Sequence, residues 1–261
     1  MKTFDRGTGT AVVVVPGIQG RWEWMRPALD ALATRYRTVS YSLCGDPGSG
    51  SRIDPQLGFD SFVRQLDAVL DRASLDRAVV CGVSYGGIIA VRYAARHPRR
   101  VSHLILVSAP GPGWQPSARQ ARYASRPWLS VPAFCVTAFE RLGAELRAAL
   151  PEWQPRASFT SRYLASALLA PMMPHLMSAR VRMQEQVDVA RDCASIDVPT
   201  LVVTGDPALD RVVPVESTRE YVRRIRGARY AMMDGTGHLG MLTRPDRFVR
   251  ILSDFIDARD P

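Results

Sequence analysis

Residues 78–96 read AVVCGVSYGGIIAVRYAAR, and this stretch decides the fold. Ala78–Cys81 is short, apolar and rich in β-branched residues, which predicts a buried strand, and the apolar run at 88–96 predicts a helix. Between them stands Ser84, with a glycine two residues to either side. Such a serine lies on a sharp turn that tolerates almost no neighbouring side chain. A strand, this turn and a helix together indicate an exposed, activated nucleophile; a solvated serine in a glycine-rich turn is the alternative.

Composition limits the classes of protein to which this chain can belong. It has 261 residues, of which 46% are hydrophobic, enough for a sizeable core in one large or two small domains. The formal net charge of +9 comes almost entirely from arginine. Genome composition is one explanation and attraction to an acidic partner is the other. Zinc patterns, recognition helices and basic clusters interleaved with aromatic residues are missing, so nucleic-acid binding is not expected.

The N-terminal sequence and the cysteines bear on the cellular compartment and on the use of metals or cofactors. The apolar run at 11–15 is far too short to span a membrane and carries no cleavage site, so we expect an unexported, cytoplasmic protein. The four cysteines are scattered and form no Cys-x-x-Cys pair, which indicates neither a disulfide framework nor a zinc site. No cofactor or metal is implied, and the oligomeric state stays open.

Strand and helix patterns alternate on both sides of Ser84. Short stretches rich in apolar or β-branched residues predict further strands at 12–15, 38–43, 103–107, 200–204 and 230–233. Helix-spaced apolar residues predict helices at 23–36, 59–75, 215–225 and 245–256. This alternation predicts the α/β class, a mostly parallel central sheet with helices on both faces. In such sheets the functional loops follow the carboxyl ends of the strands.

The pattern changes in the middle of the chain. Residues 111–190 carry helical patches broken by proline and no signal for a buried strand. We therefore expect a core domain made of 1–110 and 191–261, and a helical insertion at 111–190. Because the insertion follows a core strand, it should lie as a lid over the carboxyl edge of the sheet.

Ser84 needs a base on the same edge of the sheet. Of the four histidines, only His238 is placed there, in the loop DGTGHLG (234–240) after the last predicted strand. A histidine base in turn needs a carboxylate to orient it. Asp206 and Asp210 both follow the strand at 200–204, and either could serve.

The order Ser, Asp, His on this pattern resembles the α/β-hydrolase fold superfamily, and within it a serine hydrolase with an inserted helical cap. The resemblance covers essentially the whole chain. The family's acid commonly stands as G-x-x-D-x-x-x-P, and residues 210–214, DRVVP, fit the second half of that motif. The glycine lies five residues before Asp210 instead of three, which leaves Asp206 as an alternative. The trailing Val-Val-Pro favours Asp210.

The resemblance also implies an oxyanion hole built from two backbone amides. One is the amide of Tyr85, directly after the nucleophile. The other is the amide of Ile18 in the loop PGIQG (16–20), in which Pro16 replaces the family's usual histidine. Gln19 of the same loop could instead, or in addition, contact substrate.

The function implied is cleavage of a small-molecule carboxylic ester through an acyl-enzyme on Ser84, with His238 as base and Asp210 as orienting acid. Carbon–carbon hydrolases of the family often carry asparagine before the serine, where this chain has Val83. Three alternatives stay open: a hydrolase of an ester or thioester bound to an acyl carrier protein, an amidase or aminopeptidase that holds a substrate amine with lid acids such as Glu145, and a non-catalytic ligand-binding protein.

The lid should shape the substrate pocket. Its apolar and methionine side chains suggest an apolar acyl site, for which the candidates are Trp128, Phe134, Met172 and Met173, together with Leu239 of the histidine loop. The lid carries nine arginines against five acidic residues. This excess suggests docking of an acidic acyl carrier protein, with Arg119, Arg122 and Arg126 as the residues to test; a solvated surface is the other explanation.

Overall fold

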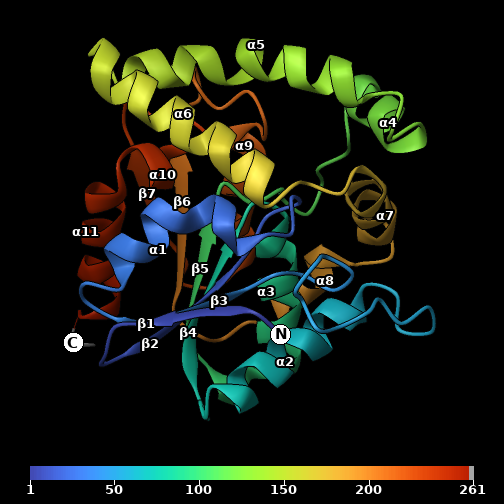
Figure 1. The fold of residues 1–261 in the computed structure, drawn as a ribbon. Helices are drawn as coiled ribbons and strands as arrows, with labels where there is room; N and C mark the ends of the chain where they lie inside the picture. Colours follow the sequence, from blue (N-terminus) through green and yellow to red (C-terminus); the bar gives the residue numbers. More distant parts are fainter. Residues whose placement is uncertain (259–261) are drawn as a thin grey trace.

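The computed structural model describes residues 1–258, with the side chains of Phe134, Cys135 and Phe139 outside that description. Within it, a seven-stranded sheet has the order β1-β3-β2-β4-β5-β6-β7 (Figure 1). The strands are β1 (Thr3–Arg6), β2 (Ala11–Val15), β3 (Arg37–Tyr41), β4 (Ala78–Val83), β5 (Val101–Val107), β6 (Thr200–Gly205) and β7 (Arg229–Met233). Only β1 is antiparallel to its neighbour among these described strands. The predicted mostly parallel sheet is confirmed.

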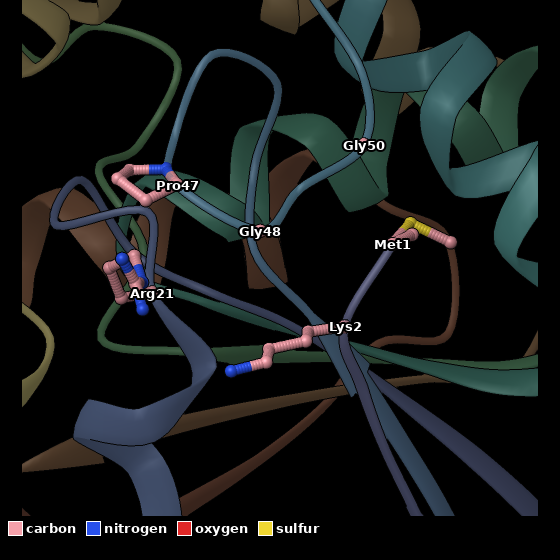
Figure 2. A pocket seen from close by; sticks show the side chains of 6 residues that line it. All are labelled: Met1, Lys2, Arg21, Pro47, Gly48 and Gly50. Carbon is pink, nitrogen blue, oxygen red and sulfur yellow. The ribbon is translucent and has the colours of Figure 1, made fainter.

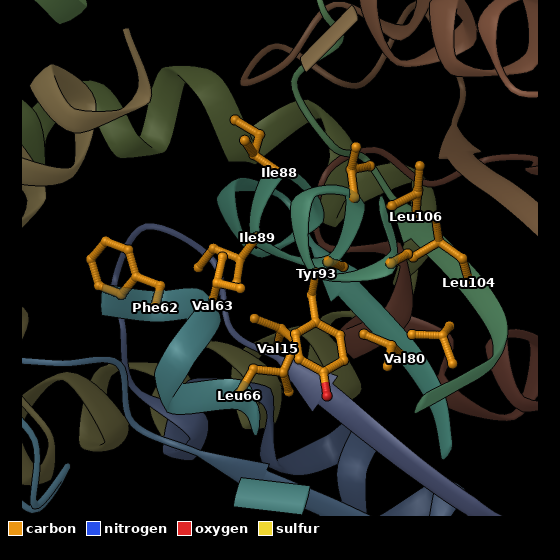
Figure 3. Packing of buried hydrophobic residues seen from close by; sticks show 14 of the residues in the cluster. Val15, Phe62, Val63, Leu66, Val80, Ile88, Ile89, Tyr93, Leu104 and Leu106 are labelled. Atoms are coloured by element: carbon orange, nitrogen blue, oxygen red, sulfur yellow. The ribbon is translucent and has the colours of Figure 1, made fainter. Parts of the chain in front are cut away.

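Helices cover both faces of the sheet. One face carries α2 (Asp60–Arg72), α3 (Tyr85–Arg96), α8 (Val189–Ala194) and α9 (Val215–Arg224); the other carries α1 (Arg26–Leu32), α10 (Gly240–Thr243) and α11 (Pro245–Ile256). Strand β2 is buried throughout, and its side chains alternate between the two cores: Val13 and Val15 join the first, Val12 and Val14 the second. Figure 3 shows Val15 packed among side chains of α2 and α3.

Four sequence expectations for the core need correction. Strand β1 was not expected, because three of its four residues are exposed and only Phe4 is buried, so it has no apolar run. The helix predicted over 23–36 is shorter: a 3₁₀ turn, η1 (Trp22–Met25), precedes α1, which ends at Leu32. The strand predicted over 38–43 ends at Tyr41. The helix after Ser84 begins three residues earlier than its apolar run, at Tyr85.

The chain between β5 and β6 is helical in the part that the structure describes. It forms α4 (Ala118–Ser125), α5 (Val131–Ala149), α6 (Trp153–Leu169) and α7 (Pro174–Gln184), followed by α8. The long helices α5 and α6 lie beyond the edge to which the arrowheads of the parallel strands point (Figure 1). The Trp24 indole donates a buried hydrogen bond to the Ala170 carbonyl at 2.9 Å and so ties the end of α6 to η1. None of the described helices combines the length and the hydrophobicity needed to cross a lipid bilayer.

Candidate active site

The turn at Ser84 holds a backbone conformation that few side chains adopt. Its φ is +52° and its ψ is −124°, between the end of β4 and the start of α3. The Ser84 N–H donates to the Val107 carbonyl at 2.8 Å, which fixes the turn to the neighbouring strand. A Cβ at Gly86 would overlap the carbonyl oxygen of Val15, so only glycine fits there. The strain is concentrated on the serine, as at many functional turns.

Three loops bring their side chains together at the carboxyl edge of the sheet. His238 Nε2, in the loop after β7, lies 3.2 Å from Ser84 Oγ, and His238 Nδ1 lies 3.2 Å from Asp210 Oδ2, in the loop after β6. The side chain of Asp210 is 1% exposed and that of His238 is 10% exposed. Ser84, His238 and Asp210 therefore form a continuous, largely buried chain of polar contacts.

The two aspartates after β6 have different environments. Asp210 uses Oδ2 for the histidine and Oδ1 to accept the N–H groups of Val212 and Val213, both at 3.0 Å. Asp206 accepts the Ala208 N–H at 2.8 Å and so stabilises its own turn. That turn accommodates the longer spacing from the glycine. The structure brings Asp210, and not Asp206, to His238.

Burial and charge act in opposite directions on the His238–Asp210 pair. Burial alone would lower the pKa of His238, but the charge and hydrogen bond of Asp210 and the charge of Glu145 outweigh it and raise that pKa above 6.5. Burial alone would raise the pKa of Asp210, but His238 and the two backbone N–H groups outweigh it and hold that pKa below 3.8. The pair is therefore arranged so that the aspartate stays ionised beside the imidazole.

Two backbone segments flank Ser84: the first turn of α3 and the loop after β2. Tyr85 is the first residue of α3, so its N–H has no acceptor within the helix. The loop after β2 turns back on itself through a hydrogen bond from Gly20 N–H to the Gly17 carbonyl at 2.9 Å. A Cβ at Gly17 would lie 3.3 Å from the Ser84 Cβ, so this loop, with Ile18 and Gln19, lies against the serine.

The residues predicted to contact substrate differ in burial and in their place in the fold. Leu239 is buried beside His238, and Met172 and Met173 are half-buried between α6 and α7. Trp128 is 61% exposed and stacks on His175, with ring centroids 5.8 Å apart. The side chain of Phe134 lies outside the described residues. The substrate-contact roles stay predictions.

Glu145 makes a contact with the histidine loop that sequence reasoning missed. It projects from α5, is fully buried and accepts the Leu239 N–H at 2.7 Å. Burial raises its pKa to about 7, although hydrogen bonds from the loop and the charge of His238 act against that rise. No sequence signal separated Glu145 from the other acidic residues of 111–190, because its burial depends on a loop 94 residues away.

A separate open hollow lies near the N-terminus. It has a volume of about 560 Å³ and is lined by Met1, Lys2, Arg21, Pro47, Gly48 and Gly50 (Figure 2). None of these lining residues belongs to the Ser84–His238–Asp210 chain, so this hollow is not the candidate site.

Comparisons with known proteins agree with this architecture. A family model described as the alpha/beta hydrolase fold matches residues 10–245. The chain is 26% identical to a 2-hydroxy-6-oxo-2,4-heptadienoate hydrolase of Pseudomonas putida, over 98% of this chain and 92% of that protein. It is 28% identical to a pimeloyl-[acyl-carrier protein] methyl ester esterase of Aromatoleum aromaticum, over 90% and 92%. The crystal structure of a bromoperoxidase from Bacillus anthracis superposes with a TM-score of 0.80 at 20% identity, over 98% of this chain and 95% of that one, and shows the same fold.

The raised pKa of Glu145 predicts a pH-dependent stability. Between its ordinary value of 4.5 and about 7, the folded protein binds this proton and the unfolded chain does not. The contribution of the group is therefore fully present below about pH 4.5 and is lost as the pH rises through about 7. We expect the free energy of unfolding of the wild type, minus that of Glu145→Gln, to fall by on the order of 3 kcal/mol over this range.

Urea unfolding at pH 5, 6, 7 and 8 measures that difference, in which the other titrating groups largely cancel. The matched control is Glu140→Gln on the same helix, whose side chain is 68% exposed. A difference for Glu145 that stays as flat with pH as that of the control would contradict the prediction.

Proposed function

We propose, on the premise that this chain belongs to the alpha/beta hydrolase fold family, that it is a serine carboxylesterase acting on small or medium apolar acyl esters. One observation carries the proposal: the two 3.2 Å contacts that run from Ser84 Oγ through the His238 imidazole to Asp210. This is the order and geometry of a nucleophile, a general base and an orienting acid. One similar protein is named as a hydrolase and another as an ester-cleaving enzyme, which supports hydrolase chemistry.

In the first half of the proposed reaction, Ser84 Oγ attacks the ester carbonyl carbon and passes its proton to His238 Nε2. Asp210 accepts the Nδ1–H bond, keeps the imidazole in the correct tautomer and stabilises its protonated form. The amides of Tyr85 and Ile18 donate to the developing oxyanion, each contributing roughly 3 kcal/mol. His238 then protonates the departing alcohol, which leaves an acyl-enzyme.

In the second half, a water molecule takes the place of the alcohol. His238 removes its proton while the water oxygen attacks the acyl carbon, and the same two amides bind the second oxyanion. Collapse releases the acid and returns the proton to Ser84 Oγ. The reaction consumes one water and requires no cofactor.

We infer that residues 111–190 act as a cap over this site. Its support includes two buried hydrogen bonds between this segment and the core: Glu145 accepts the Leu239 N–H of the histidine loop, and the Ala170 carbonyl at the end of α6 accepts the Trp24 indole N–H. Apolar side chains of the cap, with Leu239, would line the acyl side of the pocket, and Met172 and Met173 supply adaptable surface.

Removing the proposed nucleophile should separate an enzyme from a binding protein of the same fold. We expect the wild type to hydrolyse p-nitrophenyl esters and to be labelled by a fluorophosphonate, and Ser84→Ala to lose at least about 10³-fold in kcat with no labelling. A panel of esters, thioesters, anilides and a dienoate that is hydrolysed at a carbon–carbon bond shows which class of bond the protein cleaves.

Turnover of the dienoate alone, of amides above esters, or of nothing despite tight ligand binding would each overturn the esterase proposal in a distinct way. Ser108→Ala, another buried serine with positive φ, serves as the control and should keep activity.

The decrease of kcat/KM at low pH should follow the pKa of His238. Substitutions of the two aspartates should affect this decrease differently. His238 must be neutral to act as a base, and its pKa is raised above 6.5. Below that pKa, kcat/KM should fall tenfold for each pH unit. Asp210→Asn removes the main cause of the rise, so the decrease should move to lower pH and kcat should drop about 10⁴-fold.

Asp206→Asn is the matched control and should keep both this decrease and kcat within a few-fold of the wild type. Full pH profiles of kcat and kcat/KM for the three proteins measure this. A larger loss for Asp206→Asn would reverse the assignment of the acid.

A second candidate function is hydrolysis of an ester carried by an acidic acyl carrier protein. The favouring observation is that Arg119, Arg122 and Arg126, spaced to share one side of α4 and its end, are all exposed, next to the exposed Trp128 and Leu129. Exposed basic and apolar side chains in the same part of the chain suit an acidic partner. The relative from A. aromaticum is named for such a substrate.

Charge reversal should test this candidate. If a carrier docks on α4, converting Arg119, Arg122 and Arg126 to Glu should raise KM for a carrier-bound methyl ester about tenfold or more, and free methyl esters should be unaffected. Reversal of Arg72, Arg99 and Arg223, which are exposed on the core, is the matched control. Equal turnover of the carrier-bound ester by both triple variants would eliminate this candidate.

A further inference from the structure

Arg180 is a charged side chain in an unusual position. It projects from α7, in the chain between β5 and β6, yet its side chain is fully buried against the core. One terminal nitrogen donates to the Ile18 carbonyl at 2.9 Å. The other donates to the Cys44 carbonyl at 3.4 Å and forms an ion pair with Asp46, whose side chain is also fully buried.

This ion pair is poorly suited to stabilising the fold by itself. Arg180 Nε and Asp46 Oδ1 are buried without a hydrogen-bond partner among the described residues. Burial raises the pKa of Asp46 even with the guanidinium beside it. Two buried charges with incomplete hydrogen bonding recover little of their desolvation cost. What the pair does provide is a fixed position for the guanidinium.

The loop after β2 is built to receive that group. Gly20 has φ +75°, and a Cβ there would lie 2.6 Å from Arg180 Nη2 and would overlap Asp46 as well. The Gly20 carbonyl accepts the Leu43 N–H at 2.7 Å, which ties the end of the loop to the chain leading to Asp46. The Ile18 carbonyl, held by Arg180, lies inside the turn that faces Ser84.

The same guanidinium is also linked to the second oxyanion donor. It lies 6.0 Å from the centre of the Phe62 ring, and that ring meets the Tyr85 ring edge-on at 6.1 Å. Arg180 therefore contacts the Ile18 loop directly and the Tyr85 segment through one aromatic ring.

We propose that Arg180 is a positioning residue: from the helical segment it holds the Ile18 carbonyl, anchored by Asp46, and so fixes the loop whose amide binds the oxyanion. The inference rests on the proposed function for its catalytic consequence. It makes the oxyanion hole dependent on the docking of α7, so the site is complete only while this segment is seated.

Removing the guanidinium should weaken binding of the oxyanion more than binding of the substrate. For Arg180→Ala we expect kcat for an ester to fall about 10- to 100-fold, KM to stay within about threefold, and affinity for a trifluoromethyl ketone, whose adduct carries the oxyanion, to fall by the same factor as kcat. Hydrogen–deuterium exchange of peptides covering residues 16–21 should accelerate. Arg180→Lys keeps a charge but offers a single nitrogen, and should give a smaller change in each readout.

Arg92→Ala is the matched control. Arg92 is a half-buried arginine of α3 whose side chain is 15% exposed, and it pairs with Asp60 and Asp192. The Arg92→Ala substitution should lower the melting temperature and leave kcat, ketone affinity and hydrogen–deuterium exchange at residues 16–21 unchanged.

The inference would be overturned if Arg180→Ala or Arg180→Lys, like the control, lowered only the melting temperature and left kcat, ketone affinity and exchange at 16–21 unchanged. If Arg180→Ala does not fold, the Lys variant and Asp46→Asn decide by the same readouts. A wild type without ester turnover would refute the proposed function instead, and the exchange measurement would still decide whether Arg180 holds the loop.

Discussion

The positive φ of Ser84 is the constraint on which the rest of the site depends. A side chain on such a turn is pushed out of the sheet, away from the helix that begins with the next residue. The conformation persists because β4, α3 and β2 approach so closely that Gly86 has no room for a Cβ against the Val15 carbonyl. Packing of the buried central strands therefore stabilises the strained turn, and the serine hydroxyl has a fixed direction towards His238.

Parallel strands explain why residues so distant in sequence converge. Ser84 and His238 are 154 residues apart, yet each stands in the loop after a strand that ends at the same edge. Because β4, β6 and β7 are held in register by the sheet, each loop has little freedom in where it begins. His238 and Asp210 are both largely buried, and their mutual attraction outweighs the cost of burial at each group. The pKa of Asp210 is therefore lowered and that of His238 is raised.

The sequence predicted what depends on local pattern and missed what depends on distant partners. The buried strands were found because each contains a short stretch rich in apolar or β-branched residues, and Asp210 was preferred from the residues that follow it. Strand β1 was missed because an edge strand needs only one buried side chain, Phe4. Glu145 and Arg180 were missed as core contacts because a charged residue on a helix is ordinarily solvated; only the fold shows which one faces a buried carbonyl or amide.

Both of these buried ionisable side chains reach from the helical segment to a loop of the candidate site: Glu145 to the backbone beside His238, and Arg180 to the backbone beside Ser84. Apolar contacts between two layers tolerate small sliding, because dispersion and burial change gradually with position. A hydrogen bond to one carbonyl or one N–H is lost within about an ångström, and the buried group left without a partner is costly. Hydrogen bonds from these two buried side chains therefore specify one position of the segment on the core, at some cost in stability. This is the arrangement expected where the position of a loop matters more than the strength with which it is held.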